Sequence, residues 1–334
     1  MKKNYCHCSP ANSRNQQVVA LGANRMDLNR KAPYLPMITV TDSVSAVNIH
    51  AEQYCDWPQF HAMQGVDAVV HMVALLHIVN PPPAMREKYE GVNIGGTATV
   101  LEAGIKTGVS RVVLFSTIAV YGASDGCVLN EASPTQPDTF YAQTKLAAEK
   151  IVLNAKRADG QLIGTVLRLG AVYGSRIKGN YERLTRALAR NLFIPIGNGR
   201  NRRALVYDKD VGRAAALTVS HPAAAGRVFN VTDGKLHTLK EIIESICSAL
   251  GRKAPRLSLP VGPTRTLVGL IEKGSRGIGL KPSITRAIID KYTEDIAVDG
   301  SLIQKELGFV PQYDLKTGWE ETIREMREKD SFEF

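Results

Sequence analysis

The 334-residue sequence is poor in cysteine, with five in the whole chain, and it has no long apolar run. Five scattered cysteines do not make a disulfide framework. The longest apolar stretch, 66–79, is interrupted by Asp67, His71 and His77, and it falls short of the roughly 18 to 20 residues that cross a bilayer. The first residues also lack the apolar core of a signal peptide. We therefore expect a cytoplasmic protein without a membrane span.

Signatures of metal and nucleic-acid binding are scarce as well. Cys6, His7 and Cys8 have no second Cys/His pair at zinc-finger spacing, so we expect no metal site and assign 1–16 to a disordered tail. The net charge of +10 suits nucleic acid, an anionic membrane surface or phosphorylated small molecules. No aromatic-interleaved basic repeat or helix-turn-helix motif accompanies it, which argues against nucleic acid.

The most informative stretch of the chain begins with a short apolar run, VVLF at 112–115. Such a run is typical of a strand that is buried on both faces of a parallel sheet. Ser116 and Thr117 follow where this strand should end. In open α/β sheets, ligands bind beyond the carboxyl ends of the strands, so the two hydroxyls are candidate site residues.

Tyr141 and Lys145 come next, in a segment rich in helix formers that we expect to run as a helix to about 158. Their spacing of four puts them on one helix face. An ammonium beside a phenol favours the phenolate and lowers a pKa that is about 10 when unperturbed. Such a tyrosine exchanges a proton with an alcohol near neutral pH, and Thr117 can orient that alcohol. An isolated Tyr-x-x-x-Lys match is also compatible with two exposed residues on an ordinary helix.

The order of these motifs is more specific than any one of them. FSTIAVYG followed by YAQTK resembles the extended short-chain dehydrogenase/reductase superfamily, in its NAD-dependent epimerase/dehydratase branch. VDAVVHMVALLHI, LRLGAVYG and GNGRNRRALVYDKDVGRAA resemble further segments, so the resemblance covers roughly 66–325. It implies an α/β fold, a Rossmann-like doubly wound parallel sheet. A dinucleotide-binding domain would span 17–175, and a smaller C-terminal α/β substrate lobe would span 176–334, with some segments returning to the sheet.

Glycine is missing where this branch usually shows Gly-x-x-Gly-x-x-Gly, after the first strand. QVVALGANRMDLN offers a strand and Gly22, but Arg25 and Leu28 occupy the other two glycine positions. In one alignment this strand is the first of the fold. In the other, slightly favoured, it is the second, and the first strand, glycine loop and helix are missing. Both alignments predict a missing or degenerate first β-α unit.

The resemblance also implies a cofactor, a substrate and a set of site residues. The cofactor is NAD, with NADP left open, and the substrate is a nucleotide-diphosphate sugar, which the basic residues between 176 and 203 would face. Tyr141 would take the sugar hydroxyl proton, and hydride would pass to NAD and return to the other face. The implied catalytic residues are Thr117, Tyr141 and Lys145; the cofactor-binding residues are Gly22, Val73, Ala74, Asn93, Ser116, Tyr141 and Lys145; the substrate-binding residues are Thr117, Asn180 and Arg203.

The reaction subclass within this branch can be narrowed from the residues after Thr117, and two alternative functions are kept beside it. Ile118 and Ala119 stand where sugar-nucleotide dehydratases carry Asp-Glu, which argues against dehydration and leaves 4-epimerisation or simple oxidation and reduction. A hydroxysteroid-type dehydrogenase of the same superfamily is the first alternative. A non-catalytic relative that binds a nucleotide or a partner protein is the second. By analogy with relatives that dimerise through the Tyr/Lys helix, we expect a homodimer.

Overall fold

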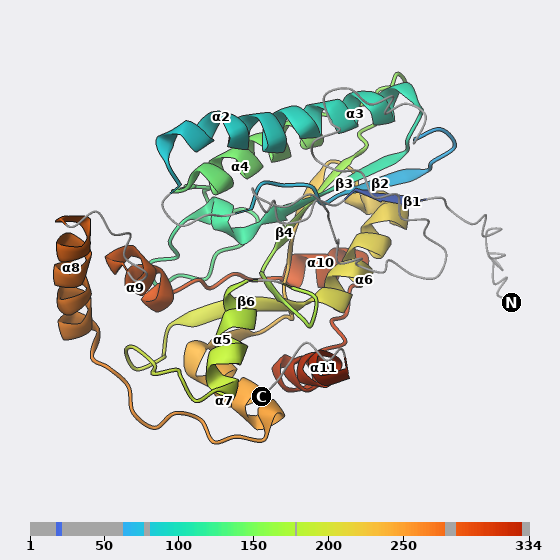
Figure 1. Ribbon diagram of the computed structural model, residues 1–334. Coiled ribbons are helices and arrows are strands. Elements are labelled where there is room, and N and C mark those ends of the chain that lie inside the picture. The colour runs from blue at the N-terminus through green and yellow to red at the C-terminus, as the bar shows by residue number, and fades with distance from the viewer. Residues whose placement is uncertain (1–17, 22–62, 77–80, 178, 278–284, 329–334) are drawn as a thin grey trace, which may run out of the picture.

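The structure is a computed structural model, and it describes residues 18–21, 63–76, 81–177, 179–277 and 285–328. Its centre is a five-stranded parallel sheet in the order β1-β2-β3-β4-β7 (Figure 1). The strands are β1 (Val18–Leu21), β2 (Ala68–His71), β3 (Arg111–Thr117), β4 (Gly164–Leu169) and β7 (Arg227–Val231). The predicted tail at 1–16 and Gly22 lie outside the described residues.

The strand β1 pairs directly with β2, with Val18 opposite Ala68. In the Rossmann order 3-2-1-4-5-6, the first strand is the neighbour of the fourth. The strand β2 belongs to the segment VDAVVHMVALLHI, which resembles the fourth strand of the superfamily, so β1 occupies the place of the first. The slightly favoured alignment assigned β1 to the place of the second strand, and this assignment is wrong. The glycine turn expected after β1 falls on residues that the structure does not describe.

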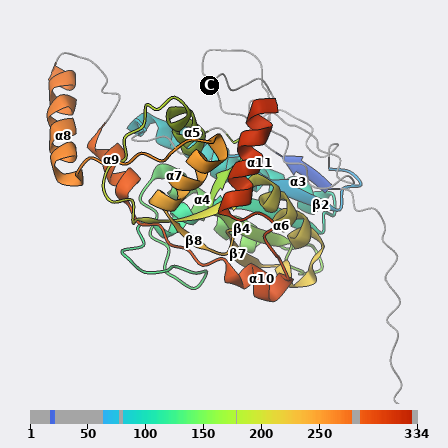
Figure 2. The ribbon, with the colours of Figure 1, turned by 90° about the horizontal axis from the view of Figure 1, so that it is seen from below.

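Helices cover both faces of this sheet, as a doubly wound fold requires (Figures 1 and 2). On one face, α3 (Gly96–Lys106) and α4 (Phe140–Leu153) bury Val100, Leu101, Ala148 and Val152 against strand residues such as Val112 and Val166. On the other face, α6 (Asp208–Ser220) and α10 (Ser301–Leu307) bury Val211, Ala215 and Ile303 against Val113 and Phe229. The apolar runs of the central strands, such as Val112 to Phe115, follow from burial on two sides.

The segment before α3 is a helix with a local defect. The sequence predicts one helix over 85–108 with a soft middle at its glycines, and the structure divides it at that place. The short helix α2 (Arg86–Tyr89) passes into a π-helical turn η3 (Glu90–Gly95) and then into α3. Such π turns inside α-helices often occur at functional sites, and this one carries Asn93.

The second lobe is built on a three-stranded sheet, β5 (Ala171–Tyr173), β6 (Arg202–Tyr207) and β8 (Leu236–Thr238). The helices α5 (Asn180–Ala189), α7 (Leu239–Leu250) and α11 (Leu315–Glu328) enclose its core. Within that core the rings of Tyr173 and Trp319 stack with centroids 4.6 Å apart. The capping box of Thr238 and Glu241 and the left-handed Gly251 at the end of α7 were both predicted and are confirmed.

The stretch 253–281, punctuated by Pro and Gly, is predicted to form a mobile substrate-side lobe, and its mobility stays a prediction. Residues Val261–Gly277 form a 17-residue helix, α8, which packs on α9 (Arg286–Thr293). Pro263 lies in the first turn of α8, where its missing N–H would have no helical partner. Gly269 leaves room for the Arg286 guanidinium, which would otherwise meet a Cβ. The remaining short turns are η2 (Pro83–Met85), η4 (Ile118–Tyr121) and η5 (Pro222–Ala224).

Candidate active site

The candidate site lies where β3 ends and α4 begins. Thr117 is the last residue of β3, at the carboxyl end of a central strand. Thr139 caps α4, because its hydroxyl accepts a hydrogen bond of 3.2 Å from the N–H of Ala142. This cap fixes the start of the helix that carries Tyr141 and Lys145, which occupy its first two turns. The helix ends at Leu153 and not near 158 as predicted.

The structure brings Thr117 and Tyr141 together, and the Thr117 hydroxyl is close enough to lower the pKa of Tyr141 by hydrogen bonding. Burial raises the pKa of Tyr141 to about 12, and the Thr117 hydrogen bond offsets only part of that rise. We had expected the ammonium of Lys145 to lower this pKa. The expectation is wrong for the protein alone, because removal of the phenolate from water outweighs the favourable interactions around it.

Lys145 is almost completely buried, with 1% of its surface exposed. Burial lowers its pKa to about 8, and the carboxylate of Glu149, one turn further along α4, opposes that shift. A buried ammonium beside two hydroxyls at the carboxyl edge of the sheet fits a ribose diol. The residues present therefore suit the nicotinamide end of NAD.

Glu149 was missed by the sequence analysis, although it extends the Tyr141–Lys145 helix face by one more turn. Its carboxylate accepts two hydrogen bonds of 3.1 and 2.7 Å from Arg168 and a third from the Ser116 hydroxyl. The Arg168 guanidinium also lies 4.8 Å from the ring centre of Tyr121. The sequence signals were a charged residue inside the buried strand β4 and the continued spacing of four. Ser116 therefore belongs to a hydrogen-bond network with Glu149 and Arg168.

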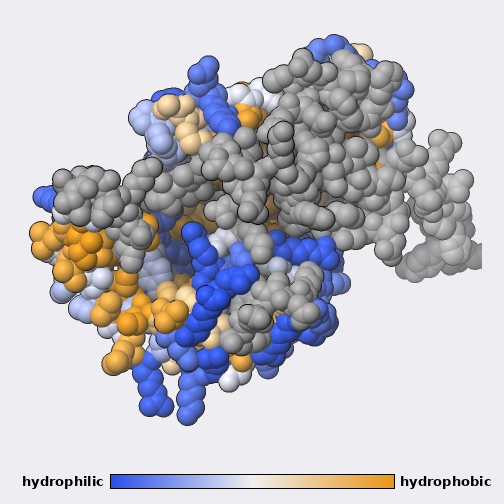
Figure 3. All heavy atoms as spheres, viewed as in Figure 1, coloured by the Kyte–Doolittle hydropathy of each residue, from blue (hydrophilic) through white to orange (hydrophobic). Residues whose placement is uncertain are grey.

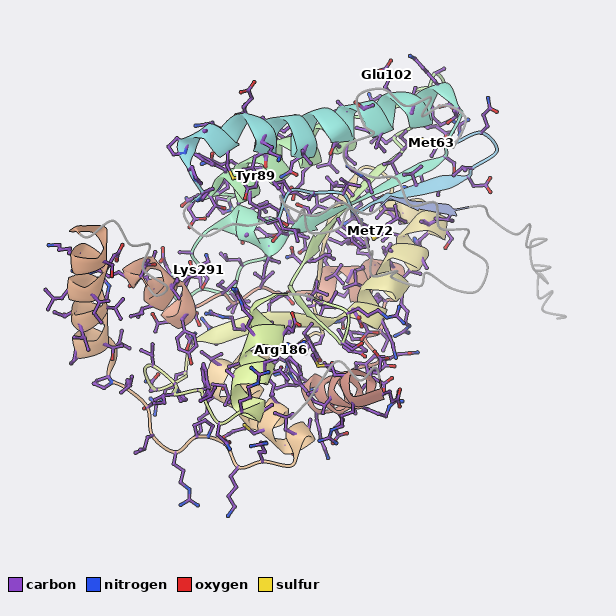
Figure 4. All side chains as sticks on the ribbon, in the orientation of Figure 1. Met63, Met72, Tyr89, Glu102, Arg186 and Lys291 are labelled. Atoms are coloured by element: carbon purple, nitrogen blue, oxygen red, sulfur yellow. The ribbon has the colours of Figure 1, made fainter. Side chains whose placement is uncertain are left out.

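Tyr89 forms part of the wall behind Tyr141. It lies between α2 and α4 (Figure 4) and is fully buried. Its hydroxyl donates to the carbonyl of Leu76 at 2.8 Å, and its ring meets Phe140 edge-on at 6.4 Å. Tyr89 adds to the rise in the pKa of Tyr141. The wall therefore favours the protonated form of Tyr141.

Asn93 holds the chain that follows β2. Its side-chain oxygen accepts from the N–H of Leu75 at 2.7 Å, and its amide donates to Thr144 on α4 at 2.9 Å. This supports the expectation that Asn93 has a structural role at the cofactor cleft. Val73, just before this loop, is buried in the core below α3, and Ala74 is partly exposed. Their predicted contact with the cofactor stays a prediction.

His71, at the end of β2, is fully buried and was expected to be a packed core residue, which the structure confirms. Its Nε2 lies 3.0 Å from the hydroxyl of Thr97, and that hydroxyl donates to the carbonyl of Asn93. Nε2 therefore carries the imidazole proton and donates it to Thr97. Burial and the charge of Lys145 lower the pKa of His71 to about 3, so the ring is neutral at neutral pH.

The predicted substrate residues Asn180 and Arg203 come from the second lobe. Asn180 is the first residue of α5; the helix cap is Gly179, so the possible capping role of Asn180 is wrong. The Arg203 guanidinium donates to the carbonyls of Tyr292 and Lys291, at 2.9 and 3.1 Å, at the end of α9 (Figure 4). It therefore satisfies carbonyls that the helix leaves unpaired. A role of either residue at a diphosphate stays a prediction.

The basic stretch between 176 and 203 is neutralised in part by acidic neighbours. Arg186 pairs with Glu182 at 3.0 Å, and Arg202 pairs with Asp295 at 2.6 Å. Arg190 and Arg200 remain exposed. The charge density of this stretch is therefore weaker evidence for an anionic substrate than the sequence suggested. None of the described helices is long and apolar enough to cross a bilayer.

Comparisons with known proteins agree with this geometry. A UDP-glucose 4-epimerase of Vibrio cholerae is 27% identical over 78% of this chain and 77% of its own length. An N-acetyl-alpha-D-glucosaminyl-diphospho-ditrans,octacis-undecaprenol 4-epimerase of Escherichia coli O157:H7 is 26% identical over 79% of this chain and 78% of its own.

Among solved structures, a UDP-glucuronic acid 4-epimerase of Bacillus cereus, in complex with UDP-glucuronic acid and NAD, has the same fold. It aligns with a TM-score of 0.68 at 17% identity, over 94% of this chain and 99% of its own. The sequence profile of the NAD dependent epimerase/dehydratase family matches residues 8–232, which include the strand β1. The chain therefore belongs to the NAD-dependent epimerase/dehydratase family of Rossmann-like enzymes, whose cofactor is NAD.

Proposed function

We propose that this enzyme is a 4-epimerase of a nucleotide-diphosphate sugar and that Tyr141, Thr117 and Lys145 carry the reaction. The observation that supports this most is the proximity of the Thr117 hydroxyl to the Tyr141 phenol at the carboxyl end of β3, with Lys145 buried one turn along α4. A sugar hydroxyl that replaces one partner in this pair would meet both an orienting group and a proton acceptor.

The roles of the three side chains follow from their positions. Thr117 orients the reacting hydroxyl by a hydrogen bond. Tyr141 takes its proton and later returns it. The Lys145 ammonium donates to the cofactor ribose, and its charge then stabilises the phenolate that forms nearby. Bound NAD supplies the hydride acceptor and, in its reduced form, the donor. Asn180 and Arg203 are proposed to contact the diphosphate once α9 or the substrate repositions the Arg203 guanidinium.

The strand end also favours epimerisation over elimination. Ile118, directly after Thr117, is buried in a core cluster and begins the turn η4. It cannot act as an acid or a base, and neither can Ala119. The family includes dehydratases as well as epimerases, and elimination needs proton-transferring groups at these positions. We propose epimerisation for this chain and a homodimer as its assembly.

The direct test is catalysis. The purified protein is incubated with NAD and, in turn, UDP-glucose, UDP-N-acetylglucosamine and UDP-glucuronic acid, and the sugars are separated by chromatography. We expect a 4-epimer of at least one of them. A 4-keto-6-deoxy product would contradict epimerisation, and activity on a hydroxysteroid alone would favour the steroid dehydrogenase alternative. Failure to bind NAD at millimolar concentration would contradict the catalytic assignment.

Tyr141→Phe tests the proton-transfer role. Removal of the phenolic hydroxyl should lower kcat by about 100-fold to 10,000-fold, the usual contribution of general acid–base catalysis. Binding of NAD should change little, because the ring remains. Tyr313→Phe is the matched control: its ring packs on Tyr207 in the second lobe, with centroids 4.3 Å apart, and the variant keeps that contact. Equal kcat values for the two variants would refute the role of Tyr141.

A further inference from the structure

The helix α8 and the loop before it expose more apolar surface than water-facing elements usually do. The exposed fraction is 59% for Leu267, 62% for Leu270 and 54% for Ile271. Leu257 and Leu259, in the preceding loop, are 82% and 43% exposed. We call these five side chains the α8 apolar surface. Contiguous exposed apolar patches of this kind mark interaction sites.

The orientation of α8 is the reverse of an ordinary surface helix. Residues 267, 270 and 271 are three and four apart, so their side chains share one face, which points away from the protein. Two charged residues of α8 contact α9: Arg265 pairs with Asp290 at 2.7 Å, and the Glu272 carboxylate accepts from the N–H of Arg286 at 3.2 Å. These polar contacts hold the apolar face outward.

Figures 1 and 2 both show α8 at the edge of the molecule, with α9 between it and the rest of the protein. The space-filling view shows an apolar area over α8 and, below it, over the loop that leads to it, from which hydrophilic side chains project (Figure 3). In the described part of the chain, therefore, the outer face of α8 has no covering element.

The sequence of α8 and of the loop before it is basic, although Arg265 is paired with Asp290. The stretch 252–277 contains six basic residues and one acidic residue, Glu272. The side chains of Lys253, Arg256 and Lys273 are exposed. The six basic residues are Arg252, Lys253, Arg256, Arg265, Lys273 and Arg276. An apolar face with a basic rim complements a surface that is apolar inside and anionic outside.

We propose that the α8 apolar surface docks onto the surface of an anionic lipid bilayer. The leucine and isoleucine side chains insert among the acyl chains at the headgroup boundary, as the apolar face of an interfacial helix does. The exposed Lys and Arg side chains bind the lipid phosphates. The contact is peripheral, because α8 lies at the interface and does not cross it.

A second copy of the chain is a poorer occupant. In a twofold dimer the same surface of each copy forms the interface, so the α8 apolar surface of one copy would face that of the other. The basic rims around the two α8 apolar surfaces would then oppose each other, and like charges at an interface are unfavourable. A lipid surface supplies the opposite charge. This proposal is independent of the substrate, and its test needs no enzyme activity.

The test is co-sedimentation of the full chain with vesicles of phosphatidylcholine alone and with vesicles that also contain phosphatidylglycerol. We expect binding to the anionic vesicles that weakens as salt is added, because exposed charges are screened. The triple variant Leu267→Asp, Leu270→Asp, Ile271→Asp should bind at least about tenfold more weakly. The control triple variant carries aspartate at three other exposed apolar positions, Ile105, Val128 and Val310, and should bind as the wild type does.

A second variant set addresses the charge. Lys253→Gln, Arg256→Gln and Lys273→Gln together should weaken binding to the anionic vesicles and reduce its salt dependence. Equal binding of the wild type and the α8 triple Asp variant would overturn the proposal, and so would equal binding to the two kinds of vesicle. If the wild type binds neither vesicle and light scattering shows that the α8 triple Asp variant alone dissociates to monomers, the surface is a contact between copies and the proposal is wrong.

Discussion

The residue with the least favourable environment in the site is Lys145, because its ammonium is buried and has a depressed pKa. The unfolded lysine releases its proton near 10.5 and the folded one near 8. Between these values the unfolded state binds more protons, so this residue makes the free energy of unfolding rise with pH. Below pH 8 both states are protonated, and the penalty is present in full.

Lys145→Met should therefore be more stable relative to the wild type at pH 8 than at pH 10.5. The shift of the pKa corresponds to a change of about 3 kcal/mol in that difference. Urea unfolding across this pH range measures it. Lys150→Met, at an exposed position of the same helix, is the control and should show a nearly constant difference. A constant difference for Lys145→Met would mean that its pKa is not depressed.

Glu149 supports the site through a buried ion pair. Glu149→Gln leaves Arg168 buried without its charged partner, which typically costs about 3 to 5 kcal/mol. We expect the double variant Glu149→Gln, Arg168→Met to regain part of that loss, because no uncompensated charge remains. Chemical denaturation of the two single variants and the double variant gives the coupling energy. Strictly additive effects would show that the pair contributes no interaction of its own.

Sequence reasoning at the residue scale found the groups that carry chemistry but not those that set their pKa values. Thr117, Tyr141 and Lys145 follow from spacing and from the end of a strand. The burial of Lys145 and the network of Glu149, Ser116 and Arg168 depend on contacts between β3, β4 and α4. Such contacts cannot be read from one helix face, which is why the predicted pKa direction for Tyr141 was wrong.

At the scale of elements, the capping box of α7 is the clearest case of sequence determining structure. The hydroxyl of Thr238 accepts from the N–H of Glu241 at 3.2 Å, and the Glu241 carboxylate accepts from the N–H of Thr238 at 2.7 Å. Thr238→Ala should lower the free energy of unfolding by about 1 kcal/mol. Thermal unfolding measures this, with the exposed Glu244→Ala as the control. An unchanged Tm would mean that water replaces the cap without cost.

Elements were predictable where the signal is local. Apolar runs rich in valine predicted β2 and β3, and segments rich in helix formers predicted α3 and α4. The glycines of 91–96 predicted a weak point in the helix, and the structure has a π turn there. The helix α8 was missed because Pro263 and its glycines are poor helix formers on average. Its formation depends on α9, through Asp290 and the backbone of Arg286.

At the scale of the whole molecule, Asp210 joins elements that are distant in sequence. It is fully buried on α6, and its carboxylate accepts from the backbone N–H groups of Gln312 and Tyr313 at 3.0 Å and from Arg213 at 2.7 Å. The segment that leads into α11 is thereby fixed to α6. This role could not be predicted from the sequence, because it depends on contacts with residues about 100 positions away. An aspartate near the start of a helix is also expected for local reasons.

Asp210→Ala should destabilise the protein by about 3 kcal/mol, because it removes three charge-assisted hydrogen bonds and leaves two backbone N–H groups without their partner. Hydrogen exchange should show the largest loss of protection at 312–326. The exposed Asp159→Ala is the control. Uniform loss of protection throughout the chain would contradict a local role of Asp210 and indicate that it supports the whole fold.

The chain crosses between the two sheets more than once, since β4 and β7 belong to the first sheet and β5, β6 and β8 to the second. A gene divided at residue 175 would therefore encode two halves of which neither holds all strands of its own sheet. We expect each half to be insoluble when expressed alone. Enzyme activity would return only when both halves are co-expressed and assemble. A split reporter divided at this residue should therefore show little activity from either half alone.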